Sequence, residues 1–223
     1  MINLGLYEIR LREEFKNMRR LQQDTAMKTF LMIWYIDRLR GNTISVLEDP
    51  SSPLFPEQYK VRYSMPVYTA KGVFKRDWKG DFTISVSPEI LMQPDSHQSP
   101  SCHLDTANGR PFNHHISEGW MCTGGLWHVA KDFGLWYFII GCGSIINQES
   151  AWMDDSGAAH LDAEAYLYWK NDRRKQKITN IEWPFDLRNR IEIGSPGDAP
   201  KNKIKIGAPL NIEKPRIKII RDK

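Results

Sequence analysis

One short stretch of the chain gathers most of the side chains that could act as a nucleophile, a base or a hydrogen-bond donor. Residues 113–128 read NHHISEGWMCTGGLWH, so a pair of histidines precedes a cysteine that is followed by Thr-Gly-Gly. A thiolate is a strong nucleophile, and imidazoles or a positive helix end near it favour its formation. Cys122 is therefore predicted to lie at a loop where backbone amides approach a carbonyl that the thiolate attacks.

Three other interpretations of this stretch stay open. Cys122 can be an inert core thiol, because free cysteine is among the most buried residue types. A papain-like thiol hydrolase would need a histidine well downstream, where His160 is the candidate. A zinc site is the third, although the chain has no C-x-x-C or H-x-x-x-H spacing; its ligands would come from Cys102, His103, His114, His115, Cys122 and His128.

The elements before this stretch must position it. From Leu6 to about Arg40 the chain lacks Gly and Pro, and apolar residues recur with helical spacing from Leu11 to Leu21. This pattern predicts an amphipathic N-terminal helix that breaks near Asp24. The apolar segment TFLMIWYI that follows suits either a buried helix or a strand.

Alternating patterns then predict an antiparallel meander. Apolar and polar residues alternate in Tyr59–Tyr68 and in Asp81–Ser87, which is typical of strands with one buried face. Between them we expect a polar turn over Gly72–Gly80. Loops are predicted for Gly41–Gln58 and for Pro88–Asn113, the latter with at most one short strand.

Helical spacing returns after Cys122. Leu135, Ile139, Cys142 and Ile146 predict a mostly buried helix, with Trp127 before it on a compatible face. A turn is expected at Trp152–Gly157. A further amphipathic helix is expected at Ala158–Asp172, and its predicted inward residues are Leu161, Ala165, Tyr168 and Trp169.

Charge divides the chain into two parts. Residues 1–172 hold 17 Lys and Arg against 21 Asp and Glu, a balance of −4, and residues 173–223 hold 14 against 6, a balance of +8. The basic part contains three similar units, RNRIEIG, KNKIKIG and KPRIKII, that recur every 13 residues. Such a segment suits an acidic partner surface or nucleic acid, or strand addition to a partner.

Composition and motifs exclude several classes of protein. Hydrophobic residues make up 41% of the chain and aromatic residues 11%, so it is not a disordered or low-complexity protein. Three cysteines without a C-x-x-C pair argue against a disulfide framework and favour a reducing compartment. The sequence shows no secretory signal, no transmembrane-length apolar run and no nucleotide-binding glycine motif. We therefore expect a cytoplasmic protein without a small-molecule cofactor.

The expected order of elements resembles that of the ubiquitin-conjugating enzyme superfamily, over roughly residues 7–172. The family motif is His-Pro-Asn-apolar followed, after a few residues, by Gly-x-apolar-Cys. Asn113-His114-His115-Ile116 occupies the first part and Gly119-Trp120-Met121-Cys122 matches the second. Asn113 replaces the family His and His114 replaces the Pro. His115 stands at the position of the family Asn, which resembles divergent bacterial relatives whose motif ends in His.

The resemblance implies a role for each of these residues. Cys122 would carry the C-terminus of a ubiquitin-like modifier as a thioester, and His115 would donate an N–H to the oxyanion. Asn113 is also expected to be one of the catalytic residues. An acidic residue in the loop between the two last helices orients and deprotonates the incoming lysine in the family, and Asp154 or Asp155 lies in the corresponding loop.

The sequence thus predicts an α+β protein with a ubiquitin-conjugating-enzyme-like fold: a catalytic domain over residues 1–176 and a basic extension over residues 177–223. Its predicted activity is acyl transfer in a bacterial conjugation or antiviral defence system. The alternatives are a catalytically inactive module that binds ubiquitin-like proteins, or a zinc-binding protein. The expected partners are a modifier, an activating enzyme and an acceptor protein, and we expect neither nucleic acid nor a membrane as a partner.

Overall fold

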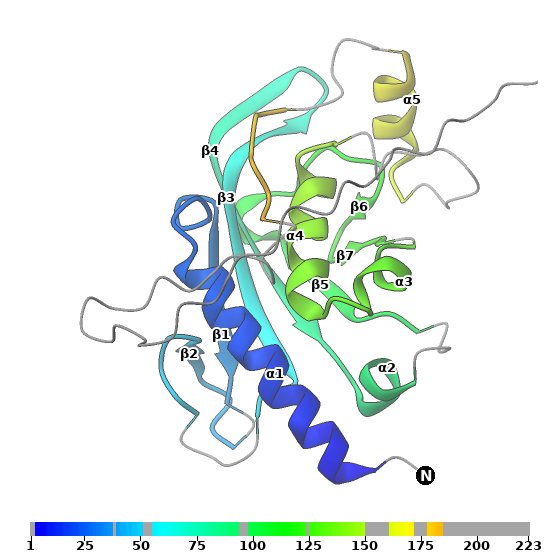
Figure 1. Ribbon diagram of the computed structural model, residues 1–223. Coiled ribbons are helices and arrows are strands. Elements are labelled where there is room, and N and C mark those ends of the chain that lie inside the picture. The colour runs from blue at the N-terminus through cyan, green and yellow to red at the C-terminus, as the bar shows by residue number, and fades with distance from the viewer. Residues whose placement is uncertain are drawn as a thin grey trace, which may run out of the picture. The chain divides into compact units, whose positions relative to one another are not determined.

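An N-terminal helix and one antiparallel sheet form the framework of the protein in the computed structural model (Figure 1). The structure describes residues 3–37, 39–50, 55–93, 98–123, 125–149, 161–171 and 178–184. Within them the sheet has seven strands in the order β2-β1-β3-β4-β5-β7-β6, and all neighbouring strands are antiparallel. The predicted α+β class is confirmed.

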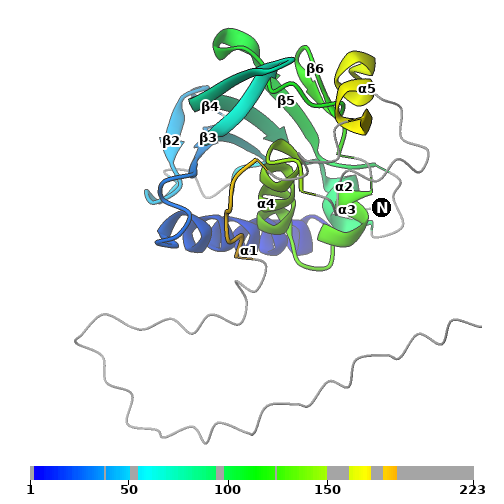
Figure 2. The ribbon, with the colours of Figure 1, turned by 90° about the horizontal axis from the view of Figure 1, so that it is seen from above.

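Within the described residues the chain forms six helices and seven strands. The helices are α1 (Leu4–Gln23), α2 (Pro88–Met92), η1 (Thr106–Asn108), α3 (Leu126–Ala130), α4 (Leu135–Ile146) and α5 (Ala163–Asn171). The strands are β1 (Leu31–Ile36), β2 (Thr43–Ser45), β3 (Gln58–Ala70), β4 (Val73–Ser85), β5 (Ser101–Asp105), β6 (Ile116–Ser117) and β7 (Trp120–Met121). In the view from above, α1 and α4 lie on the same side of the sheet (Figure 2).

The helix α1 has the amphipathic character that its sequence predicts. Its N-cap Asn3 accepts a hydrogen bond from the Leu6 backbone N–H (3.2 Å), and the helix ends before Asp24, whose backbone is extended. The buried positions include Leu11, Phe15 and Leu21, which line one face. The sequence pattern of the next segment suited either a buried helix or a strand. It is the strand β1, which pairs with both β2 and β3.

The predicted polar turn over Gly72–Gly80 is wrong. Strand β4 begins at Val73, and the turn consists of Lys71 and Gly72, where a φ of 72° favours glycine. Here the two strands extend past their neighbours in the sheet, so most of the charged residues of this stretch face solvent. A run of exposed charged residues has the same sequence pattern as a loop, which explains the wrong prediction. The expected loop over Gly41–Gln58 also contains β2, and Pro88–Asn113 contains α2 and η1 besides the strand β5.

Helix α4 is buried along nearly its whole length, as its apolar sequence predicts. Its side chains contribute Trp136, Phe138 and Ile139 to the main core, together with residues of α1 and the inner face of the sheet. The Tyr63 hydroxyl on β3 donates a hydrogen bond to the Ile139 carbonyl (2.7 Å), which ties the sheet to the helix. Trp127 lies on the separate short helix α3 rather than on an extension of α4.

Glu14 of α1 holds the beginning of α4. This buried carboxylate accepts a hydrogen bond from the Leu135 backbone N–H (2.7 Å) and pairs with Arg10 Nε (2.8 Å). A Cβ at Gly134 would lie 2.8 Å from the carboxylate, and Gly134 has a φ of 120°, so glycine is required at this position. A negative charge at a helix N-terminus is also favoured by the helix dipole.

A second, smaller core surrounds helix α5. Ala165 and Trp169 are buried against Phe112, with Tyr68 and Tyr168 packed beside them. The prediction that Leu161 points inward is wrong, because this residue precedes the helix and is 40% exposed. The predicted start of this helix and the turn at Trp152–Gly157 lie outside the described residues.

Residues 178–184 pack against α4, although they follow residue 176, where the predicted catalytic domain ends. Asn147 exchanges two hydrogen bonds with Thr179 (2.8 and 3.0 Å), and Trp183 Nε1 donates to Glu149 (2.7 Å). A Cβ on Gly143 would lie 2.3 Å from the Trp183 ring, so the tryptophan lies directly against the helix backbone. The three tail units lie outside the described residues.

Replacing Glu14 by alanine is predicted to destabilise the fold. The substitution leaves the buried Leu135 N–H without its acceptor and Arg10 without its carboxylate, which should cost about 2–4 kcal/mol in the free energy of unfolding. Urea unfolding followed by circular dichroism measures this. The control is Glu13→Ala, which removes only an exposed pair with Lys16 and should cost less than about 0.5 kcal/mol. Equal effects of the two substitutions would contradict the capping role.

Candidate active site

Cys122 lies directly after a small hairpin that joins it to the histidine segment. Strands β6 and β7 pair Ile116 with Met121 and Ser117 with Trp120, and Gly119 in the turn has a φ of 79°. Beyond the pairs, the Cys122 backbone N–H donates a hydrogen bond to the His115 carbonyl (2.7 Å). The two halves of the sequence motif are therefore held side by side at one end of the sheet.

Of the three cysteines, only Cys122 is partly exposed. Cys102 on β5 and Cys142 on α4 are buried in the main core, so the prediction of a core role for Cys142 is confirmed. Burial raises the pKa of the Cys142 thiol well above its ordinary value, and the hydrogen bond with the Cys102 thiol raises it further. Because both of these thiols are buried and a substrate cannot reach them, Cys122 is the candidate nucleophile.

Asn113 is fully buried and its side chain is used inside the fold. Its Nδ2 donates to the Ile145 carbonyl at the end of α4 (2.7 Å), and its Oδ1 accepts from the His115 backbone N–H (2.8 Å). One amide therefore joins the histidine segment to the last turn of the buried helix. This geometry gives Asn113 a positioning role toward His115 and Cys122.

His114 and His115 are both buried, with ring centroids 4.2 Å apart. The His114 ring also meets Tyr166 of α5 edge-on at 5.7 Å. The His114 carbonyl accepts backbone hydrogen bonds from Leu161 and Asp162 (2.9 and 3.3 Å). The histidine pair therefore lies between the hairpin that leads to Cys122 and the segment that leads into α5.

Arg110 and Asp162 hold α5 against this segment, and neither residue was among the predicted site residues. Arg110 Nη1 lies 2.6 Å from an Asp162 carboxylate oxygen and also donates to the Ile116 carbonyl (3.0 Å). The other carboxylate oxygen of Asp162 accepts from the Ala165 N–H (2.9 Å) and so caps α5. The capping part could have been found, because Asp directly precedes the helix-forming stretch. Asp154 and Asp155, the predicted bases, lie outside the described residues.

The predicted set of zinc ligands is not brought together. Among the described residues, no three of the types His, Cys, Asp and Glu gather in a group that could hold a metal ion. On β5 the Cys102 side chain faces the core, while the neighbouring His103 is exposed on the opposite face. His128 is exposed on α3. His160, the histidine of the papain-like alternative, lies outside the described residues.

The surface next to Cys122 carries one large exposed ring. Trp120 is 55% exposed, two residues before the cysteine, and the His103 ring meets it edge-on with centroids 5.3 Å apart. Its register partner on β5 is the same histidine. Alternation along β7 explains the orientation, because Met121 between Trp120 and Cys122 points into the core.

The chain was compared with family models, with curated proteins and with solved structures, and none of them matched. The function therefore has to be argued from the residues of this chain and their arrangement. In the described part of the chain, no helix has both the length and the apolar character needed to cross a membrane.

Cys122 is predicted to be the first cysteine to react with a thiol reagent. In the folded protein, N-ethylmaleimide should add once, and the two buried thiols should react at least about tenfold more slowly because they need local opening. Intact mass spectrometry over time measures the additions. Cys122→Ser should remove the fast addition, while unfolding in urea should expose every thiol. A fast addition that persists in Cys122→Ser would contradict the assignment.

Asn113→Ala is predicted to destabilise the protein and to loosen the site. The substitution leaves the buried His115 N–H without its acceptor and removes one of the donors to the Ile145 carbonyl, which still accepts from the Gln148 N–H (3.0 Å), so it should cost about 1–3 kcal/mol. Thermal and urea unfolding measure the stability, and the maleimide rate at Cys122 reports the site. Asn108→Ala, on the exposed helix η1, serves as the control and should change neither quantity. Wild-type stability in Asn113→Ala would refute the positioning role.

Proposed function

We propose that this protein is a ubiquitin-like protein conjugating enzyme that carries the C-terminus of its modifier as a thioester on Cys122. It passes the modifier to an acceptor amine in a bacterial conjugation or antiviral defence system. The observation that carries the proposal is that Cys122 is partly exposed and that its backbone N–H is held by a hydrogen bond to the carbonyl of His115. No other described cysteine has access to a macromolecular substrate.

The order of the described elements supports this proposal. Helix α1 comes first, and β1, β3, β4 and β5 then follow as sheet neighbours in chain order, which makes a meander. The histidine segment, Cys122, the buried helix α4 and the shorter helix α5 complete the sequence of elements. This is the order in which the resemblance to ubiquitin-conjugating enzymes implies that they should occur. The proposed fold is accordingly of the ubiquitin-conjugating type.

The proposed chemistry has two acyl-transfer steps. In the first, the Cys122 thiolate attacks the thioester that joins the modifier to the activating enzyme, and the thiol of that enzyme leaves. In the second, an acceptor amine attacks the Cys122 thioester, an amide forms, and the Cys122 thiolate leaves while the amine loses its proton to a base. ATP is consumed by the activating enzyme, so no cofactor is needed on this chain.

Three further residues take roles in the second step. His115 donates an N–H toward the oxygen on which negative charge develops, and such a donor typically lowers the barrier by about 2.7–4 kcal/mol. Asn113 keeps the His115 backbone in place through its own hydrogen bond (2.8 Å). Asp155 orients the amine and accepts its proton. The proposed location is the cytoplasm, where a thiol that must stay reduced is stable.

The test is the formation of a thioester. The full chain is incubated with ATP, a candidate modifier and its activating enzyme, and adducts are resolved by electrophoresis with and without reductant and by intact mass spectrometry. We expect a reductant-sensitive adduct that Cys122→Ala abolishes. Cys122→Lys should give a reductant-resistant amide adduct instead.

The matched control is Cys102→Ala, which removes a buried thiol and should still form the adduct. An adduct that survives in Cys122→Ala would refute the proposal. Tight binding of the modifier without any adduct on the wild-type chain would instead favour an inactive binding module.

A further inference from the structure

The hairpin of β3 and β4 extends past the rest of the sheet. β1 pairs with β3 only over residues 59–63, and β5 pairs with β4 only over residues 81–85. The remaining part, residues 64–79, is a two-stranded ribbon with register shifts at Met65/Val67 and Tyr68/Ala70. In Figure 1 this ribbon projects at the top of the sheet beside α5. We call it the β3–β4 ribbon.

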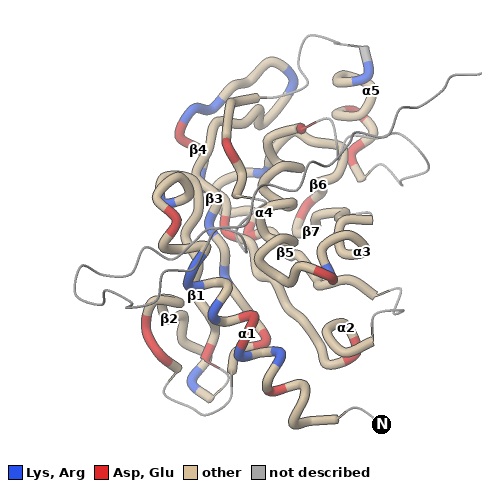
Figure 3. The backbone as a smooth tube through the Cα atoms, in the orientation of Figure 1, with Lys and Arg blue, Asp and Glu red and all other residues tan. Residues whose placement is uncertain are grey.

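The outer half of the β3–β4 ribbon is basic and exposed. Lys71 lies in the turn, Lys75, Arg76 and Lys79 follow on β4, and Asp77 is the one acidic residue between them. All five side chains are exposed, and no ion pair within the described part of the chain involves any of the four basic residues. The basic colour along the end of the hairpin is visible in Figure 3. The ribbon thus presents cations that have no ion-pair partner among the described residues and that a polyanion could contact.

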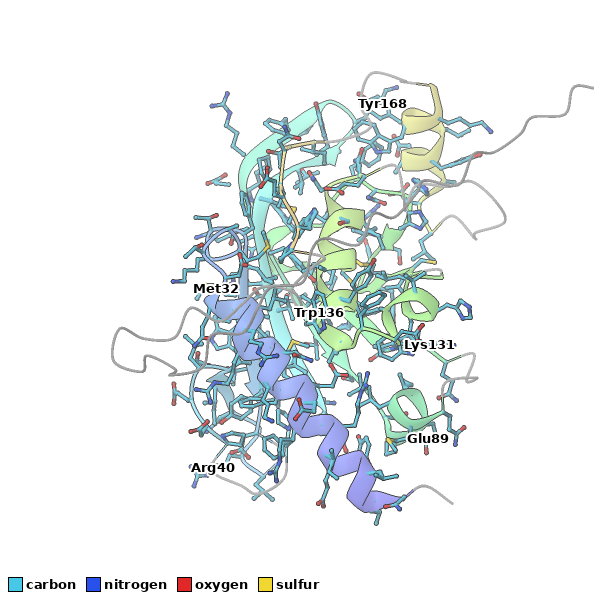
Figure 4. The ribbon with its side chains drawn as sticks, viewed as in Figure 1. Met32, Arg40, Glu89, Lys131, Trp136 and Tyr168 are labelled. Carbon is cyan, nitrogen blue, oxygen red and sulfur yellow. The ribbon has the colours of Figure 1, made fainter. Side chains whose placement is uncertain are left out.

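Aromatic rings lie among these cations. Phe74 is 45% exposed and packs against Tyr68, with ring centroids 5.2 Å apart. The Lys71 ammonium lies 5.7 Å from the centroid of the Tyr168 ring on α5. Figure 4 shows Tyr168 at the end of α5 that lies beside the ribbon. The ribbon therefore carries a partly exposed ring together with several positive charges, and Phe74 and Lys75 lie on its opposite faces because successive strand residues alternate.

Protection of a strand edge does not account for this surface. Lysines on an exposed edge prevent pairing with other chains, but exposed Val73 and Phe74 would have the opposite effect. The arrangement does not suit a lipid surface either, because binding to lipid grows with the apolar area that is buried, and the exposed large apolar residues of the ribbon are only Val73 and Phe74. Here the apex is Lys71 and Gly72, and the apolar residues lie behind it along β4.

We propose that the β3–β4 ribbon binds single-stranded nucleic acid. Lys71, Lys75 and Arg76 contact phosphates, and a base stacks on Phe74, which is the combination of cations and rings that such proteins use. From the sequence, nucleic acid was considered only as a partner of the basic segment over residues 173–223, not of this ribbon. The proposal is independent of the thioester chemistry, because it uses none of the residues around Cys122.

The first test is binding of the full chain to fluorescein-labelled oligo(dT) and oligo(rU) of about 20 nucleotides, followed by anisotropy at several salt concentrations. Lys75→Glu/Arg76→Glu should weaken binding at least about tenfold and lower the log–log salt slope by about 0.7 for each lost phosphate contact. The control, Lys16→Glu/Lys28→Glu, makes the same charge change on exposed residues elsewhere and should keep the wild-type slope. Equal losses in the two variants would overturn the proposal.

The second test locates the base. Phe74→Ala should weaken binding about fivefold or more without changing the salt slope, because stacking is lost and the phosphate contacts remain. Oligonucleotides with 5-iodouridine should crosslink to the peptide that contains Phe74, as mapped by mass spectrometry. Crosslinks confined to residues 185–223 would overturn the proposal. Binding of phosphatidylglycerol vesicles, with no binding of the oligonucleotides, would overturn it in favour of a lipid surface.

Discussion

The burial of the apolar helix α4 is the constraint on which the rest of the protein depends. Its side chains cannot face water without a large cost in free energy, so α1, the sheet and residues 178–184 must cover it. Burial of a helix also removes its backbone ends from water, and these then need partners within the protein. Glu14 supplies one at the start of α4, and Asn113 supplies one near its end.

The second of these contacts connects stability to the candidate active site. Because the amide of Asn113 binds both the Ile145 carbonyl and the His115 N–H, the histidine segment is fixed relative to the buried helix. His115 then accepts the hydrogen bond of Cys122, so the position of the thiol is set through two side-by-side backbone segments. The thiol that we propose as the nucleophile is thus positioned through contacts to the buried helix, so that a mobile substrate end would meet a nucleophile that is already in place.

The two proposed activities occupy different parts of the molecule. The thioester site lies where β7 passes into α3, and the basic surface lies on the β3–β4 ribbon beside α5. Helix α5 contacts both regions, because Tyr166 meets His114 while Trp169 meets Tyr68 of the ribbon. This helix is joined to the histidine segment by the Arg110–Asp162 pair and to the ribbon mainly by aromatic packing.

The sequence by itself determined the elements whose buried residues recur at a regular spacing along the chain. The helical spacing from Leu11 to Leu21 and the alternation of Tyr59, Val61 and Tyr63 each predict one buried face, and the structure has those faces. The apolar run of α4 predicts a helix that is buried nearly all round, and this is also found. The sequence also marked Cys122 and its neighbours as the reactive stretch, from residue types alone. Only the tertiary structure decided whether the charged stretch before Gly80 was a turn or a strand.

Only the tertiary structure also decided that Cys102 lies in the core and that the Asn113 side chain binds a carbonyl of a helix that is distant in the chain. The physical reason is that these outcomes depend on which distant segments cover a residue. A local sequence pattern does not indicate these neighbours, because they come together only when the whole chain packs.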